Sequence, residues 1–136
     1  MAKVGNYISF KKKTNKSSRN YKMEQIANYN LMNNYDYKLY VDIVKNNMDT
    51  NSRVELEKLK QDIESGIIDK VVVISLSNIN RNHFILLDFM KFLKDNACEL
   101  ESIKEGRLYL DDYDRIILKQ NEILEEENVR WIMKKN

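Results

Sequence analysis

Residues 68–82, IDKVVVISLSNINRN, decide the fold of this chain. The apolar run at 71–74 is typical of a strand that is buried on both faces of a parallel sheet. A polar turn follows it, and from about His83 the apolar spacing predicts a helix. Ligands of open α/β sheets bind beyond the carboxyl ends of the strands. Asn78 and Arg81 are therefore candidate site residues, and the cation suggests a phosphate partner.

Strand and helix patterns alternate along the rest of the chain. Short segments rich in β-forming residues are separated by segments whose apolar residues recur every three to four positions. This order predicts a single α/β domain over 1–136, doubly wound, with a mostly parallel sheet of four to five strands flanked by helices. The expected strands are 3–10, 37–44, 67–76, 98–103 and 108–110, and the expected helices are 21–33, 52–65, 82–96 and 111–134.

The helix at 52–65 has the clearest end signals. Ser52 and Glu55 form the S-x-x-E pattern of a capping box, in which each side chain satisfies a main-chain donor of the first turn. Gly66 follows the helix and suits the left-handed position that ends many helices. These signals predict both ends of the helix.

The last predicted helix, at 111–134, is longer than the core at about 3–110 requires. Such a helix spans about 36 Å, and Ile117, Leu124 and Trp131 recur along it every seven residues. Two interpretations fit this pattern. Part of the apolar stripe contacts another chain, which gives a homodimer or higher oligomer, or the whole helix lies on the sheet.

Composition excludes several classes of function. The chain of 136 residues carries a net charge of +2 and a single cysteine, Cys98, which favours a soluble protein of a reducing, cytoplasmic compartment. One histidine and no acidic cluster at ligand spacing argue against a metal site. Glycine-rich phosphate or dinucleotide motifs are missing, so no cofactor is expected. No apolar run reaches the roughly 18 residues of a membrane span.

Basic residues are distributed unevenly. Six lie within residues 11–22 without an intervening acid, and three more lie near the end of the chain. The residues of these two groups that we expect to contact DNA are Lys12, Lys13, Lys16, Arg130, Lys134 and Lys135.

Polar and basic residues also follow the predicted strands. They are expected to share one edge of a parallel sheet, where guanidinium groups match the geometry of phosphate. The alternative is a solvated charged rim without a ligand, and the spacing of the residues leaves both readings open. The members of this rim are Ser9, Lys11, Asp42, Arg53, Ser77, Asn78 and Arg81.

The order of these motifs over about residues 3–134 resembles the catalytic domain of serine recombinases, the resolvase/invertase family. That family has Y-x-R-V-S at its first strand, a downstream Gln, D-x-x-x-S-G, R-P-x-L and L-D-R-L-x-R-[SN]. With Tyr7 on the motif's Tyr, Ser9 takes the place of its Arg and Lys11 the place of its nucleophilic Ser. Gln25 then falls on the downstream Gln without a gap. A register slipped by two residues places Ser9 on the nucleophile instead.

The later motifs match in part. Asp42 lies on the loop Asp, although the Ser-Gly pair is missing, and Arg53 lies on the Arg of R-P-x-L. In the Leu-Asp-Arg motif, Ser77 replaces the Asp, Asn78 replaces the first Arg, and Arg81 retains the second. The family nucleophile and two arginines are thus replaced, which implies a degenerate active site.

The resemblance implies three alternative functions. The leading one is a catalytically inactive recombinase-like domain that dimerises, associates with DNA and regulates a mobile element or phage, either alone or in mixed dimers with a full-length recombinase. The second is an active small recombinase or nickase that uses Ser9. The third is a protein-interaction module without DNA. Because the sequence ends at Asn136, no separate DNA-binding domain is expected.

Overall fold

The computed structural model describes residues 3–46, 49 and 52–108, which form an α/β domain built on one sheet. The strand order is β2-β1-β3-β4-β5; the first four strands are parallel and β5 runs antiparallel to β4. This confirms the predicted fold class. The elements are β1 (Lys3–Lys11), α1 (Lys16–Met32), β2 (Tyr37–Val44), α2 (Val54–Glu64), β3 (Ile68–Val73), the 3-10 helix η1 (Leu76–Asn78), α3 (His83–Asp95), β4 (Glu99–Ser102) and β5 (Gly106–Leu108).

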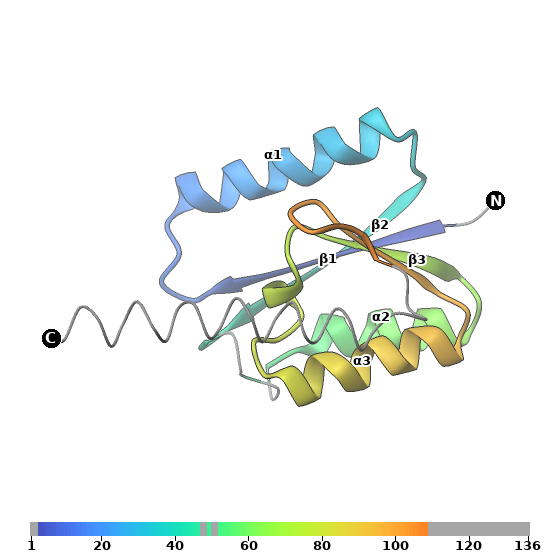
Figure 1. Ribbon diagram of the computed structural model, residues 1–136. Coiled ribbons are helices and arrows are strands. Elements are labelled where there is room, and N and C mark those ends of the chain that lie inside the picture. Colours follow the sequence, from blue (N-terminus) through green and yellow to red (C-terminus); the bar gives the residue numbers. More distant parts are fainter. Residues whose placement is uncertain (1–2, 47–48, 50–51, 109–136) are drawn as a thin grey trace, which may run out of the picture.

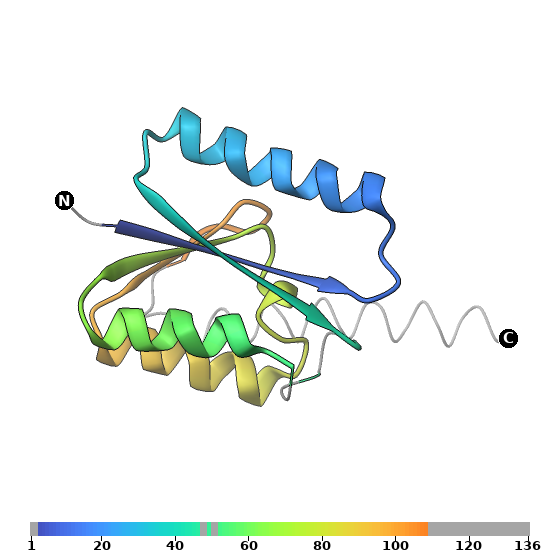
Figure 2. The ribbon, with the colours of Figure 1, turned by 180° about the vertical axis from the view of Figure 1, so that it is seen from behind.

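The helices cover the sheet unequally. Among the described helices, α1 covers one face, and α2 and α3 lie side by side on the other (Figures 1 and 2). The larger core lies beneath α2 and α3, where Tyr7, Tyr40 and Leu59 are fully buried. A smaller core around Ile8 and Ile26 lies beneath α1. Strand β1 contributes to both cores because it lies between β2 and β3.

Gly5 permits the close approach of α2 to the central strand. A Cβ atom at this position would lie 2.6 Å from Cδ1 of Leu59, well inside van der Waals contact. Leu59 therefore packs directly on the β1 main chain. The short separation places the beginning of α2 against the end of the sheet.

The beginning of α2 differs from the sequence prediction. Arg53 occupies the N-cap without a capping side chain, and the main-chain N–H groups of Glu55 and Leu56 donate to the Asp42 carboxylate at 2.9 and 3.0 Å. The expected capping box of Ser52 is therefore wrong. A carboxylate from the neighbouring strand satisfies these donors, and its negative charge also favours the positive end of the helix.

Other boundaries shift for local reasons. Helix α1 begins at Lys16 instead of residue 21, because Asn15 accepts a hydrogen bond from the Ser18 N–H at 2.8 Å. Strand β3 ends at Val73, three residues early, since η1 follows. Gly66 has φ of +77°, as the predicted helix end requires. Strand β5 lies at 106–108 instead of 108–110. The expected helix at 111–134 lies outside the described residues.

A polar network joins α1 to the sheet. Glu101 of β4, whose side chain is 8% exposed, accepts hydrogen bonds from the hydroxyls of Tyr29 and Tyr35 and pairs with Lys70 at 2.9 Å. Burial opposes ionisation of Glu101, but the hydrogen bonds from Lys70 and the two tyrosines outweigh it and hold the pKa of Glu101 below its ordinary value. The network favours the charged carboxylate.

We expect Asp42→Ala to destabilise the domain by about 2–4 kcal/mol, because α2 loses its cap and the buried Tyr7 hydroxyl loses its acceptor. Ser52→Ala is the matched control and should change the free energy of unfolding by less than about 0.5 kcal/mol. Urea unfolding of both variants measures this difference. An equal loss of unfolding free energy in Asp42→Ala and Ser52→Ala would contradict the assignment of the cap to Asp42.

Glu101→Gln should destabilise the domain by about 1–3 kcal/mol at pH 7, where the charged network is complete. The lowered pKa of Glu101 means that its contribution is present above the unfolded value of about 4.5 and is lost as the pH falls through the folded value. The gap between wild type and variant should therefore close as the pH falls below about 4.5. Urea unfolding at pH 7 and at acidic pH measures this gap. A gap that does not close with acidification would contradict the prediction. The control is Glu64→Gln, at an exposed position.

Candidate functional site

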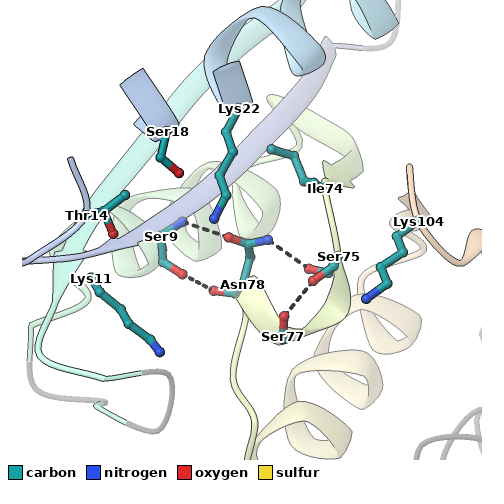
Figure 3. A pocket seen from close by; sticks show the side chains of 10 residues that line it. All are labelled: Ser9, Lys11, Thr14, Ser18, Lys22, Ile74, Ser75, Ser77, Asn78 and Lys104. Atoms are coloured by element: carbon teal, nitrogen blue, oxygen red, sulfur yellow. Dashed lines mark hydrogen bonds between the residues drawn. The ribbon is translucent and has the colours of Figure 1, made fainter. Parts of the chain in front are cut away.

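A pocket of about 390 Å³ lies at the carboxyl edge of the sheet, where β1 and β3 end beside η1 (Figure 3). It is bordered by the end of β1 and the turn after it, the first turns of α1, the segment from β3 to η1, and the turn after β4. Its lining residues are Ser9, Lys11, Thr14, Ser18, Lys22, Ile74, Ser75, Ser77, Asn78 and Lys104.

The main-chain carbonyl of Asn78 joins the pocket to the core. It accepts a hydrogen bond from the Ser9 hydroxyl at 2.7 Å and another from Nη1 of Arg53 at 2.7 Å. Ser9 is 7% exposed and Arg53 is 4% exposed, so both donors are largely removed from water. This one oxygen therefore fixes the position of η1 relative to β1 and α2.

Arg53 also binds protein oxygens on its other sides. Its Nη1 donates to the Tyr7 hydroxyl at 3.0 Å, and its Nε donates to the Asp49 carbonyl at 2.6 Å. The Tyr7 hydroxyl in turn donates to Asp42 at 2.8 Å. Burial raises the pKa of Tyr7 well above its ordinary value, Arg53 opposes this and Asp42 adds to it. The tyrosine is thus a neutral donor that links the arginine to the carboxylate.

The Asn78 side chain spans the main chains of β1 and the segment after β3. In one amide orientation its nitrogen donates to the Ser9 carbonyl at 3.1 Å and its oxygen accepts from the Ser75 N–H at 3.3 Å. In the orientation drawn in Figure 3, the two bonds measure 3.4 Å each. In either orientation the amide fastens the end of β1 to Ser75.

The positive charge of the pocket comes from lysines. Lys11 is at the end of β1, Lys22 reaches in from α1, and Lys104 approaches from the turn after β4 (Figure 3). The ammonium of Lys22 also lies 5.9 Å from the ring centroid of Phe10. The lining contains no carboxylate, so the pocket is positively charged and rich in hydroxyl groups.

The predicted rim is only partly assembled in this pocket. Ser9, Lys11, Ser77 and Asn78 line it, whereas Arg53 is not among the lining residues and donates to the Asn78 carbonyl. Asp42 is buried, accepts a hydrogen bond from the Tyr7 hydroxyl and is not among the lining residues. Lys12, Lys13, Lys16 and Arg81 are exposed and are not among the lining residues. Arg130, Lys134 and Lys135 lie outside the described residues.

Sequence reasoning missed several lining residues: Thr14, Ser18, Lys22, Ser75 and Lys104. Ser18 and Lys22 are four positions apart, the spacing of neighbours on one helix face, but the segment 11–20 was expected to be a loop. Lys104 carried no signal, because its position depends on how the turn after β4 folds back. Its main-chain N–H donates to the Ile74 carbonyl at 2.9 Å.

The described residues contain neither a metal-ligand cluster nor a membrane-spanning helix. Within 3–46, 49 and 52–108, no group of three or more His, Cys, Asp or Glu side chains could hold a metal ion. No helix in the same part of the chain is long and apolar enough to cross a membrane.

Comparison with protein families identifies the class of protein. Residues 8–135 match the model of the resolvase N-terminal domain. Because this match covers most of the chain, the protein belongs to the resolvase family and is a serine recombinase catalytic domain, a class whose function is DNA recombination in mobile elements. No curated protein matches the chain significantly.

Solved structures share the fold at low sequence identity. The N-terminal catalytic domain of TP901-1 integrase superposes with a TM-score of 0.71 at 18% identity, covering 91% of this chain and 97% of that one. A resolvase family site-specific recombinase from Streptococcus pneumoniae gives 0.66 at 21% identity, covering 99% and 95%. A serine recombinase from Sulfolobus solfataricus gives 0.61 at 16% identity, covering 93% and 98%.

Proposed function

We propose that this chain is a resolvase-family domain that associates with DNA without cleaving it, and that it acts as a dimerising regulatory or accessory protein of a mobile element or phage. Family membership supports the association with DNA and the tendency to dimerise. The absence of cleavage is inferred from the hydrogen bonds at the Asn78 carbonyl.

Those hydrogen bonds oppose a nucleophilic role for Ser9. A serine becomes a nucleophile when a nearby base accepts its proton. The Ser9 hydroxyl instead donates to a main-chain carbonyl at 2.7 Å, and a carbonyl does not take up a proton. The hydroxyl thus serves to hold η1 against β1.

The nearest guanidinium is similarly committed to the protein. Arg53 is 4% exposed and donates to Tyr7, Asn78 and Asp49. Stabilisation of a phosphoryl transition state needs preorganised cations aimed at the oxygens where charge develops, and loss of one such donor costs on the order of 10²–10³ in rate. The cations that border the pocket are lysines, which act as point charges and lack the fork geometry of arginine.

Lys11 occupies the family's nucleophile position in the register that also aligns Gln25. Its amine can hold a phosphate, but it does not provide the hydroxyl from which a phosphoserine linkage forms. The second candidate function, an active recombinase or nickase that uses Ser9, is favoured by one observation. Ser9 lines the pocket at the carboxyl end of the central strand.

We expect no covalent protein–DNA adduct and no nicking when the chain is incubated with supercoiled plasmid, because the Ser9 hydroxyl donates to a main-chain carbonyl and Arg53 donates to protein oxygens. The measurement is denaturing electrophoresis with labelled DNA before and after protease treatment. An adduct that forms with wild type and disappears in Ser9→Ala would overturn the proposal and establish the enzyme.

DNA association should be electrostatic and should weaken steeply with salt. Each phosphate contact contributes about −0.9 to the slope of log K against log salt concentration. We expect the double variant Lys12→Gln, Lys13→Gln to flatten this slope by about one to two, because both lysines are exposed in the turn after β1. The matched double variant Lys58→Gln, Lys91→Gln carries the same charge change on α2 and α3 and should leave the slope unchanged.

These binding measurements use closed circular duplex DNA in a gel-shift series over several salt concentrations. Binding that does not depend on salt, or no binding at all, would contradict the association with DNA and favour a protein-interaction module.

A further inference from the structure

The pocket combines three lysines with five hydroxyl-bearing side chains and lacks a carboxylate among its lining residues. We propose that it is a binding site for a phosphomonoester, the doubly charged terminal phosphate of a nucleic-acid strand or of a mononucleotide. This goes beyond the proposed function, because it holds whether or not the chain binds intact duplex DNA.

The charge around the pocket fits a dianion. Lys11, Lys22 and Lys104 approach it from three different elements, so their charges surround the space instead of forming a stripe along one face (Figure 3). None of the three forms an ion pair with another described residue. A ligand with two negative charges would therefore meet cations that the described part of the chain does not neutralise.

The beginning of α1 adds to this positive potential. Ser18 lies in the first turn of this 17-residue helix and lines the pocket, and that turn contains no acidic residue. Helix N-terminal ends favour anions, and acidic side chains usually occupy the first turn. Here the turn carries Lys16 instead, and Lys22 follows Ser18 one turn later. This charge pattern disfavours the isolated helix and is consistent with an anion supplied from outside.

Hydroxyl groups add hydrogen-bond donors to the pocket. The hydroxyls of Ser75 and Ser77 lie 2.6 Å apart and share one hydrogen bond. Because the pair has two hydroxyl hydrogens and uses one internally, the second is available to an acceptor. Thr14 brings a further hydroxyl from the turn after β1. Phosphate oxygens are acceptors, so the donors match the ligand.

The phosphomonoester is preferred over an internal phosphodiester for two reasons. A monoester carries about −1.5 to −2 charges at pH 7 and three strongly accepting oxygens, whereas a diester carries one charge and two chain extensions. Three lysines on different elements favour the higher charge. The volume of about 390 Å³ lies near the lower end of the range for ligand pockets, about 300–1,000 Å³, and suits a terminal group better than a continuous strand.

Isothermal titration of the full chain tests the proposal. The ligands are a short single-stranded oligonucleotide with a 5′ phosphate, the same oligonucleotide with a 5′ hydroxyl, and adenosine 5′-monophosphate against adenosine. We expect the terminal phosphate to increase affinity about tenfold, as a charge-assisted contact does, and inorganic phosphate to compete. If the mononucleotide binds, the ligand of the pocket is a small phosphate compound. If only the phosphorylated oligonucleotide binds, the ligand is the end of a strand.

Lysine variants test whether the affinity for the terminal phosphate depends on the pocket. Lys22→Met and Lys104→Met should each lower the affinity for the phosphorylated ligand about tenfold. Lys91→Met, which removes the same charge from an exposed position on α3, should not. Circular dichroism verifies that all three variants fold.

Equal affinity for the phosphorylated and hydroxyl oligonucleotides would overturn the proposal, as would an equal loss in Lys91→Met. Closed circular duplex has no strand ends, so its binding reports on the proposed function alone. The two proposals can therefore fail separately.

Discussion

The structure depends on a buried chain of hydrogen bonds that runs from Asp42 through Tyr7 and Arg53 to the carbonyl of Asn78. The chain begins at the end of β2, crosses the central strand and the beginning of α2, and ends in η1. Burying a carboxylate and a guanidinium is costly unless each is hydrogen-bonded. In this placement of the four elements both buried groups have hydrogen-bond partners, so the network holds the carboxyl edge together.

This arrangement separates the groups that hold the edge together from the groups that a ligand can reach. Asp42 is engaged by the first turn of α2, and Arg53 is engaged by the oxygens of neighbouring segments. The lysines of the pocket lie outside this network and carry the accessible positive charge. A lysine ammonium binds phosphate as a point charge, whereas arginine offers a planar fork. The described lining of the pocket therefore offers point charges for an anion.

The fold could be predicted because its main signals are local. The apolar run at 71–74 and the alternation of strand and helix patterns each depend on neighbouring residues, and they give the correct parallel core. The capping of α2 could not be predicted in this way. Ser52 and Glu55 satisfy the sequence pattern, but Asp42, which is close only after the sheet has formed, provides the stronger acceptor. A charged tertiary partner replaced the local neutral cap.

The candidate site, like the fold, could be predicted only as far as local sequence signals reach. Ser9, Lys11 and Asn78 were identified because strand ends converge in any parallel sheet. Lys22 and Lys104 were missed, because their positions depend on the packing of α1 and on the turn after β4. Arg81 was expected in the site. It follows η1, is exposed and does not line the pocket. A one-turn helix rotates the chain within three residues, and the sequence does not specify that rotation.

In the alignment proposed with the recombinase motifs, three of the matching positions have a structural task in this domain. Tyr7, Asp42 and Arg53, which match, belong to the buried network that holds β1, β2, α2 and η1 together. Lys11 and Asn78, which depart, line the pocket. The presence of these three residues is therefore consistent with a role in folding and does not by itself indicate strand cleavage. We infer that the chemistry depends on the second group, where the proposed alignment places a lysine and an amide on the motif's hydroxyl and guanidinium.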